Sequence, residues 1–355
     1  MDTAAFEYVG NPSRIVFGSG ERKRLAEISE DLRCKRLLVL STDVQKETAN
    51  ELAQDLGDRC LGVYAKATMH TPIEVTEAAM QVIAEQKADG LIAFGGGSTT
   101  GLGKAIAYRT DLPQIVLPTT YAGSEVTPIL GETMNGLKTT IKSAKVLPEV
   151  VIYDPDFTLG LPREMTITSG INAVAHAVEA LYAKDRNPVT SLMALDGAKA
   201  ILTALPVLGD RPTDADARAQ ALYGAWLCGS VLGQVGMSLH HKLCHTLGGS
   251  FNLPHAETHT VVLPYATAYN EAAVGDLLAP LAEVLGASSL AQGLFDMNSR
   301  LGAPTSLKEI GMAKAGVTEA AKIALSNPYW NPRALDPEAI QSLIAQAHAG
   351  ERPAA

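Results

Sequence analysis

Residues 91–104 read LIAFGGGSTTGLGK, and this segment gives the clearest indication of the fold in the first half of the chain. Leu91–Phe94 is a short apolar run typical of a buried strand, and Gly95-Gly96-Gly97-Ser98 then opens a helix. Bare backbone at such a turn can approach a phosphate, and the helix N-terminus supplies N–H donors and a positive dipole end. The turn is neither a GxGxxG motif nor a P-loop. It favours a dinucleotide site, with a turn that binds no ligand as the alternative.

Short apolar runs alternate with helical patterns around this stretch, the rhythm of βαβ units and a mostly parallel sheet. We expect strands at 13–17, 36–40, 91–94, 114–117 and 150–153, and a hairpin over residues 130–146. Thr71-Pro72-Ile73-Glu74 reads as a capping box with proline at the first helical position, opening a helix that ends near Gly90. Asp154-Pro155 ends the sheet, because the residue before proline avoids the helical conformation.

Hydroxyl side chains follow two of the expected strands, at the edge where parallel sheets bind ligands. Thr119 and Thr120 follow one strand, and Ser41 and Thr42 follow another. At the second position a ribose-binding site usually has a carboxylate, whereas small hydroxyls do not repel a 2′-phosphate. We therefore expect either NADH or NADPH as cofactor, with a helix N-cap as the alternative role of this pair.

From about Leu161 the sequence changes to alanine- and leucine-rich helical segments without a convincing strand. We expect a dinucleotide-binding, Rossmann-like α/β domain at 1–157 and an all-helical domain at 158–355, with the active site in the cleft between them. Ala219–Leu239 is uncharged and long enough to span a membrane, but polar residues interrupt it, so we expect a buried core helix there. The helices should break at Asn187-Pro188, Arg211-Pro212, Gly302-Ala303-Pro304 and Asn327-Pro328.

Residues 240–255 read HHKLCHTLGGSFNLPH, and five of the eight histidines lie between positions 240 and 259. Residues four apart share a helix face, so His241 and His245 project together, as Asn172 and His176 do from an earlier helix. His255 can return from a loop to complete a pocket. The cluster indicates a catalytic or metal-binding site rather than core packing.

Metal binding and acid–base roles compete for these histidines. Zinc and iron sites commonly include a carboxylate, whereas the amide of Asn172 is a poorer ligand. We therefore expect His176, His241 and His255 to bind metal weakly or not at all. Lys138 is solvated by default, but a dianionic substrate would need local cations in this acidic chain, so it is a candidate contact, with Arg163 and Lys242 as further ones. Tyr121 and Ser124 are candidate nicotinamide contacts.

The composition bounds the kind of partner. With 355 residues, 46% of them hydrophobic and 19% charged, the chain can build two cores. A net charge of −9 disfavours nucleic acid and anionic membranes, so a small molecule is the expected ligand. Four scattered cysteines fit neither a disulfide framework nor a CxxC zinc site. The scattered cysteines indicate a reducing compartment, and no secretory signal is visible, so we expect a cytoplasmic protein.

The order Gly-Gly-Gly-Ser, Pro-Thr-Thr, [Asp/Asn]-x-x-x-His and His-x-x-x-His, with a third histidine ten residues later, resembles the iron-containing (group III) alcohol dehydrogenase family along nearly the whole chain. The wording at residues 69–72, 95–104, 118–125, 225–228, 240–245 and 253–259 is closer still to the maleylacetate reductases of that family. The resemblance implies a dehydroquinate synthase-like architecture, a homodimer, and NAD(P)H-dependent reduction of the carbon–carbon double bond of maleylacetate to 3-oxoadipate in aromatic compound degradation.

The resemblance also assigns residues. Metal ligands of metal-dependent relatives match Asn172, His176, His241 and His255, and His245 matches a position near the nicotinamide. Together with the residues singled out from the sequence patterns, the expected catalytic set is His241, His245, His255, His176 and Lys138. The sequence patterns give the expected cofactor contacts, which are Ser41, Thr42, Gly95, Gly96, Gly97, Ser98, Thr119, Thr120, Tyr121, Ser124 and Lys138.

Three other functions remain open. A metal-dependent alcohol or aldehyde oxidoreductase of the same family would lose its activity when its iron or zinc is removed. A dehydroquinate synthase-like lyase would show no net NADH consumption. A dinucleotide-binding regulator would bind NADH without turnover.

Overall fold

The computed structural model describes residues 5–134 and 137–354, with the side chains of residues 137 and 138 outside the description. The chain divides into a sheet unit, residues 10–161, and a helical unit, residues 162–355 with the segment that ends at Val9. The predicted division after residue 157 differs from this. Asp154 accepts hydrogen bonds from the backbone of Gly20 and Arg22 and caps the 3-10 turn η6 (Pro155–Thr158), which ties that turn to the sheet unit. No sequence pattern marked the grouping of the first residues with the helices.

Six parallel strands form the sheet, in the order β1-β8-β5-β4-β2-β3. They are β1 (Arg14–Phe17), β2 (Leu37–Leu40), β3 (Cys60–Tyr64), β4 (Gly90–Gly95), β5 (Gln114–Pro118) and β8 (Val150–Tyr153). All five expected strands and the mostly parallel sheet are confirmed. The sequence reading missed β3, an edge strand whose first four residues are only partly buried and whose Gly62 interrupts the apolar pattern.

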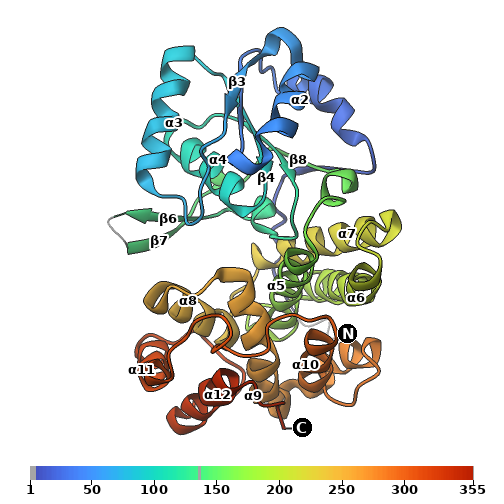
Figure 1. The fold of residues 1–355 in the computed structure, drawn as a ribbon, viewed down its shortest axis with the longest axis vertical. Coiled ribbons are helices and arrows are strands. Elements are labelled where there is room, and N and C mark those ends of the chain that lie inside the picture. The colour runs from blue at the N-terminus through green and yellow to red at the C-terminus, as the bar shows by residue number, and fades with distance from the viewer. Residues whose placement is uncertain (1–4, 135–136, 355) are drawn as a thin grey trace. The chain divides into compact units, whose positions relative to one another are not determined.

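Each face of the sheet has its own apolar core, because successive residues of a strand point to opposite sides. Leu37 and Val39 pack with α1 and α2, whereas Leu38 and Leu40 pack with α3 and α4. Figure 1 shows α2 and α3 on opposite sides of the sheet. Burial on both faces explains why these strands are continuous apolar runs. The helices are α1 (Leu25–Asp31), α2 (Lys46–Leu56), α3 (Ile73–Gln86) and α4 (Gly97–Thr110).

The start of α3 differs from the prediction. Pro72 is the N-cap rather than the first helical residue, and no side chain caps this end. Thr71 has a φ of +47°, so the predicted capping box is wrong. The helix ends at Gln86, four residues before Gly90, because Lys87 adopts the left-handed conformation.

The hairpin is a separate two-stranded antiparallel sheet. Strand β6 (Ile129–Met134) pairs with β7 (Leu137–Lys142), which confirms the hairpin predicted over residues 130–146. The backbone of Lys138 pairs with Thr133. The predicted role of the Lys138 side chain lies outside the described residues.

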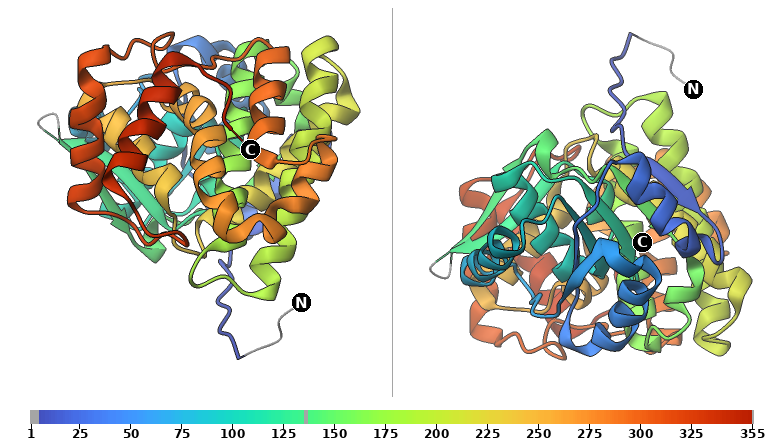
Figure 2. Two further views of the ribbon diagram at one scale, coloured as in Figure 1. Left: turned by 90° about the horizontal axis from the view of Figure 1, so that it is seen from below. Right: turned by 90° about the horizontal axis from the view of Figure 1, so that it is seen from above.

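The described residues of the helical unit from Pro162 onward form helices, turns and loops without a strand, as predicted. Helix α6 begins at Pro188 behind a capping box that Asn187 forms with Thr190, and the other predicted breaks also separate helices. Helices α5, α6 and α7 pack side by side (Figures 1 and 2). The helices are α5 (Arg163–Tyr182), α6 (Pro188–Asp210), α7 (Ala215–Leu232), α8 (Leu239–Phe251), α9 (His255–Val284), α10 (Leu290–Arg300), α11 (Val317–Ser326) and α12 (Pro337–Ala349).

The apolar stretch 219–239 is not one helix. Helix α7 ends at Leu232 and α8 begins at Leu239, with Gly233 and Gly236 in the connection. Among the described residues, one helix, α6, is long and apolar enough by composition to cross a membrane. Half of its apolar window is buried, and it packs against α5 and α7, as a core helix does.

Candidate active site

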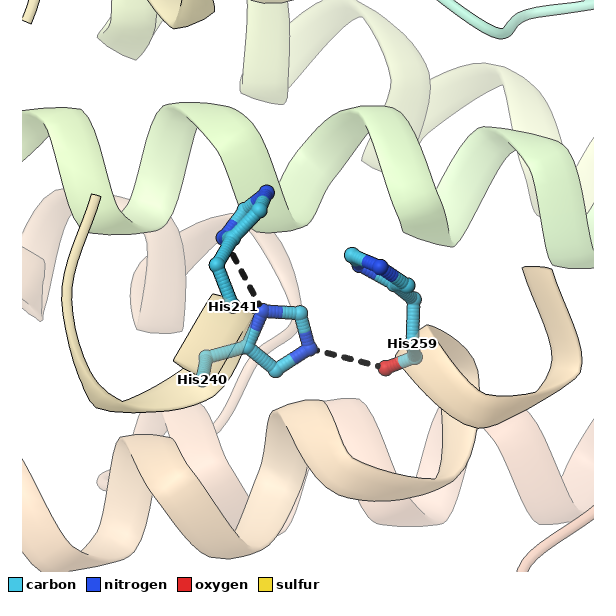
Figure 3. Close-up of side chains that lie close together, drawn as sticks. All are labelled: His240, His241 and His259. Carbon is cyan, nitrogen blue, oxygen red and sulfur yellow. Dashed lines mark hydrogen bonds between the residues drawn. The ribbon is translucent and has the colours of Figure 1, made fainter. Parts of the chain in front are cut away.

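Three helices of the helical unit carry the histidine cluster. Helix α5 supplies Asn172 and His176, α8 supplies His240, His241 and His245, and α9 supplies His255 and His259. The four-residue spacing places each pair on one helix face, as the sequence predicts. Figure 3 shows His240, His241 and His259 turned toward one another from α8 and α9.

His241 lies at the centre of the cluster. Its ring centroid is 5.2 Å from that of His176, 5.0 Å from that of His259 and 6.1 Å from that of His245. His255 joins through His259, with 4.3 Å between ring centroids. The structure therefore brings together the four predicted histidines and adds His259, which the sequence reading counted in the cluster without assigning it a role.

A buried carboxyl holds His241 in place. Glu179, three residues after His176 on α5, lies with Oε2 2.7 Å from His241 Nδ1. It also accepts hydrogen bonds from the backbone N–H groups of Ser238, at 2.8 Å, and His240, at 2.7 Å. Sequence reasoning missed Glu179, although its three-residue spacing from His176 on an apolar helix was a usable signal.

Burial sets the protonation of the cluster. It lowers the pKa of His240 to about 3 and the pKa values of His176, His241 and His259 well below the usual range, and neighbouring imidazoles act in the same direction. These rings are therefore neutral near neutral pH. Burial also raises the pKa of the Glu179 carboxyl.

Several buried polar atoms of the cluster have no hydrogen-bond partner among the described residues. They are Asn172 Oδ1, His176 Nδ1, His241 Nε2 and both ring nitrogens of His259. Buried polar groups are rarely unsatisfied, so this concentration marks a place for a ligand, an ion or ordered water. Neutral imidazoles, one of them oriented by a carboxyl through its other nitrogen, are donors that suit zinc or iron. His176, His241 and Asn172 thus fit a divalent ion in their donor atoms, although the amide contributes no negative charge.

A second group of donors overlaps the first. Ring nitrogens of His240, His241 and His259 lie within 4.8 Å of one another. However, His240 Nδ1 is 3.4 Å from His241 Nδ1, and His240 Nε2 is 3.1 Å from the His259 carbonyl oxygen (Figure 3). Because both nitrogens of His240 face protein atoms, this residue supports the cluster rather than binding a ligand.

Two histidines lie at the exposed edge of the cluster. His245 and His255 are exposed, in contrast to the buried rings. His245 Nδ1 is 3.0 Å from Tyr329 Oη, and Lys242 Nζ is 5.5 Å from the centroid of the Tyr329 ring. Tyr329 belongs to the loop after α11, and no sequence pattern pointed to it.

The glycine turn of the sheet unit has the predicted strand-to-helix geometry. Gly95 has a φ of +147°, and an added Cβ there would lie 2.5 Å from Thr99 Oγ1. At Gly96 the added Cβ would lie 3.0 Å from Thr120. Position 95 therefore requires glycine, and a side chain at position 96 would have to displace the Thr120 side chain. The turn presents bare backbone at the N-terminus of α4, where a pyrophosphate can bind.

The neighbouring strand ends meet at this turn. The Thr119 N–H donates to the Gly95 carbonyl at 3.1 Å, which places the Pro-Thr-Thr loop beside the glycines as predicted. Gln45 Nε2 donates to Thr119 Oγ1 at 2.8 Å, and Gln45 Oε1 is 3.4 Å from Thr42 Oγ1. Thr42 occupies an N-cap position without a side-chain cap bond, and Ser41 is buried. Gln45 was not predicted, because glutamine after a strand is not distinctive.

Behind the turn lies a buried lysine that sequence reasoning assigned no role. Lys104 Nζ donates to the carbonyl oxygens of Ser124, Thr127 and Ile129 and to Thr127 Oγ1. Burial lowers the pKa of Lys104 to about 7, while the Glu125 carboxylate opposes this shift. Lys104 thus fixes the loop that leads into β6 and does not reach a phosphate.

The other predicted contact residues differ in how accessible their side chains are. Tyr121 is fully buried, whereas Ser124 is half-buried, so the side chain of Ser124 is the more accessible of the two. Arg163 begins α5 and donates from Nε to the Gly209 carbonyl at 2.9 Å.

The chain is similar to known maleylacetate reductases along nearly its whole length. The chain is 57% identical to a maleylacetate reductase of Rhizobium sp. over 98% of its length and 99% of the relative's. It is 53% identical to one from Burkholderia cepacia, again over 98% of this chain and 99% of that one. The crystal structure of maleylacetate reductase from Agrobacterium tumefaciens superposes with a TM-score of 0.96 at 56% identity, covering 99% of this chain and 100% of that one.

Family models match both units. The model described as iron-containing alcohol dehydrogenase matches residues 12–155, and the C-terminal model of the Fe-containing alcohol dehydrogenase family matches residues 166–348. Together they span most of the sheet unit and the helices that carry the histidines. The chain therefore belongs to the iron-containing alcohol dehydrogenase family.

Proposed function

We propose that this protein is an oxidoreductase that reduces the carbon–carbon double bond of maleylacetate with NADH or NADPH and releases 3-oxoadipate. The proposal rests on the full-length similarity to maleylacetate reductases, one of which, from Rhizobium sp., is 57% identical to this chain. The histidine cluster and the glycine turn supply the two kinds of site that this reaction needs.

The chemistry of the substrate defines what the protein has to do. Maleylacetate has a double bond between a carboxylate-bearing carbon and a ketone. A reduced nicotinamide, when bound, supplies the hydride. Hydride addition at the carboxylate-bearing carbon moves negative charge onto the ketone oxygen, and protonation of the carbon next to the ketone completes the reduction. The protein must therefore stabilise an enolate oxygen and exclude water.

The buried imidazoles are suited to that oxygen. Burial raises the pKa of the Glu179 carboxyl, and in its neutral form this carboxyl can donate to His241 Nδ1 and leave the hydrogen of the ring on Nε2. Nε2 then becomes a hydrogen-bond donor toward the ketone oxygen. His176, whose ring lies 5.2 Å away, offers a second unpartnered nitrogen. We assign proton donation to the exposed His245 and His255 at the edge of the cluster.

In the other protonation state of Glu179, the same histidine nitrogens would bind a metal ion. With Glu179 ionised, His241 Nδ1–H donates to it and Nε2 presents a lone pair. His176, His241 and His255, with the Asn172 oxygen, would then hold a divalent ion that polarises the ketone. We propose that the reduction proceeds without a metal, because Asn172 provides no charge to offset a cation. A metal-dependent alcohol or aldehyde oxidoreductase is the alternative, favoured by the unpartnered nitrogens of His176 and His241.

The cofactor is assigned to the sheet unit. The backbone of Gly95, Gly96, Gly97 and Ser98 binds the pyrophosphate, and Ser41, Thr42, Thr119 and Thr120 contact the rest of the dinucleotide. The Gln45 contact to Thr119 adds a residue to this set. With no carboxylate directly after β2, both NADH and NADPH should be accepted. Lys138 is assigned to the dinucleotide or the substrate carboxylates.

We further propose that the enzyme works in the cytoplasm as a homodimer, with no nucleic acid or membrane partner. The four cysteines are free thiols, as expected in a reducing compartment. The acidic net charge supports a small-molecule partner.

Spectrophotometric NADH oxidation with freshly prepared maleylacetate tests the function, with 3-oxoadipate identified as product. We expect turnover with NADH and also with NADPH, and we expect this turnover to survive exhaustive chelation. Activity lost on chelation and restored by iron or zinc would establish the metal-dependent alternative. NADH binding without any turnover would contradict both.

A further inference from the structure

The edge of the histidine cluster carries two side chains, Lys242 and Tyr329, to which the proposed reduction assigns no role, beside His245, to which it assigns proton donation. Lys242 and His245 are three residues apart on α8, so they share one helix face. Tyr329, from the loop after α11, lies over that face. Its Oη is 3.0 Å from His245 Nδ1, and its ring centroid is 5.5 Å from Lys242 Nζ.

Among the described residues, Lys242 forms no ion pair with a carboxylate, and its ammonium group lies over the face of the Tyr329 ring. A cation held over an aromatic ring is positioned without being neutralised. In a chain with a net charge of −9, such a cation beside exposed hydroxyl and imidazole groups is a binding element for an anion.

Tyr329 is placed to act as a donor in the same group. It is 36% exposed, so its side chain is accessible, and burial of the remainder raises its pKa and keeps the phenol protonated. When His245 Nδ1–H donates to the phenol oxygen, the phenol hydrogen is available for an acceptor outside the protein. Lys242 and Tyr329 together then present an ammonium and a hydroxyl, two donors that match a carboxylate.

We propose that Lys242, Tyr329 and His245 form a carboxylate subsite that binds the carboxylate on the methylene arm of the keto-diacid substrate. The assignment rests on the proposed function for the identity of the diacid. His245 is next to His241, at 6.1 Å between ring centroids, so the subsite adjoins the imidazoles that receive the ketone oxygen. Of the two substrate carboxylates, the one on the methylene arm is separated from the ketone carbon by fewer bonds. The other adjoins the carbon that accepts the hydride.

The subsite accounts for selectivity as well as affinity. An alcohol or aldehyde without a second anionic group cannot use it, whereas a keto-diacid gains a charge-assisted contact next to the reacting ketone. Lys242 and Tyr329 are thereby specificity-determining residues for this reaction.

Two substrates that differ by one carboxylate test the proposal. 4-Oxopent-2-enoate keeps the enone and the alkene carboxylate of maleylacetate but lacks the arm carboxylate. Lys242→Met should raise KM for maleylacetate by about 10- to 100-fold, the range for a lost charge-assisted hydrogen bond, with little change in kcat. KM for 4-oxopent-2-enoate should stay as in the wild type. Lys242→Arg should recover much of the loss, and Tyr329→Phe should raise KM for the diacid alone.

Controls separate recognition from folding and from the identity of the reaction. Lys322→Met, on the exposed surface of α11, removes the same charge and should leave both KM values unchanged. Calorimetric binding of 3-oxoadipate, which requires no turnover, should weaken in Lys242→Met even if maleylacetate were not the substrate. Equal KM increases for both substrates, or unchanged binding of 3-oxoadipate in Lys242→Met, would overturn the subsite.

Discussion

His241 has Nδ1 2.7 Å from the buried Glu179 carboxyl, and its Nε2 has no partner among the described residues. The proton shared between Glu179 and Nδ1 therefore decides whether Nε2 is a donor or a lone pair. A donor stabilises an enolate directly, and a lone pair binds an ion. This single contact links a family that is named for iron to a reaction that we propose to run without it.

Glu179→Gln tests that link. The amide keeps the size of the side chain, but its NH2 group can donate to His241 Nδ1 and cannot accept from a backbone N–H, so a contact to Ser238 or His240 is lost. We expect a loss of about 2 kcal/mol in the free energy of unfolding and a fall in kcat of about 10-fold or more. Denaturant titration and steady-state kinetics measure the two effects. Full activity in a stably folded variant would show that Glu179 does not position His241.

The turn between β4 and α4 contains glycines that the packing of the fold needs and one glycine that only a bound ligand would need. Gly95 and Gly96 are held by close contacts, but an added Cβ at Gly97 would meet only the Ala122 Cβ, at 3.9 Å. The fold does not require glycine at position 97, whereas the close approach of a pyrophosphate to the backbone would require it.

Gly97→Ala should therefore affect cofactor binding and not folding. We expect the free energy of unfolding to change by no more than about 1 kcal/mol. The Kd for NADH should rise about 10-fold or more, because a charge-assisted contact to phosphate is lost. Fluorescence titration with NADH measures the affinity. Gly160→Ala is the matched control, since its added Cβ meets no atom within 4 Å, and it should leave the Kd unchanged. Equal affinity in both variants would remove the phosphate site from this turn.

The loop between β5 and β6 depends on Lys104 in a similar way. Lys104→Met fills the same space but leaves the carbonyl oxygens of Ser124, Thr127 and Ile129 without their donor. We expect a loss of about 3 kcal/mol in the free energy of unfolding of the sheet unit. Lys145→Met, which removes an exposed lysine paired with Asp111 at 3.5 Å, should cost less than about 1 kcal/mol. Denaturant titration compares them, and equal costs would contradict a clamping role.

For the whole molecule, the parts that sequence predicted are those with local signals. Apolar runs such as Leu91–Phe94 gave the strands, and helix breakers such as Asn187-Pro188 gave the helix boundaries. The half-exposed strand β3 gave no such run. The capping box at Thr71 failed because the backbone there turns left-handed, a property of the packed chain rather than of four residues.

The site shows the same division. Four-residue spacing was sufficient to place His241 with His245 and Asn172 with His176, because one helix carries each pair. The contacts that give the cluster its chemistry join distant positions, such as Glu179 with His241 and Tyr329 with His245. Such contacts depend on how helices pack, and a single sequence carries no record of that packing.

The buried histidines make the whole helical unit sensitive to acid. His240 has a pKa of about 3 in the folded protein against 6.5 in the unfolded chain, so the unfolded chain binds more protons below pH 6.5. The free energy of unfolding should therefore fall as the pH decreases from about 6.5 toward 3. His240→Gln keeps a donor for the His259 carbonyl and should show a shallower fall in denaturant titrations between pH 8 and 4.5. An unchanged slope would contradict the neutral, buried state of His240.

In the mechanism that we propose, buried imidazoles stabilise the charge that forms on the ketone oxygen of the substrate. The most direct measurement is the single-turnover rate of NADH oxidation by maleylacetate in His241→Ala, together with its Kd for NADH. We predict a rate about 10²-fold or more below that of the wild type, with NADH affinity unchanged. A near-normal rate in a folded variant that binds NADH would contradict the claim.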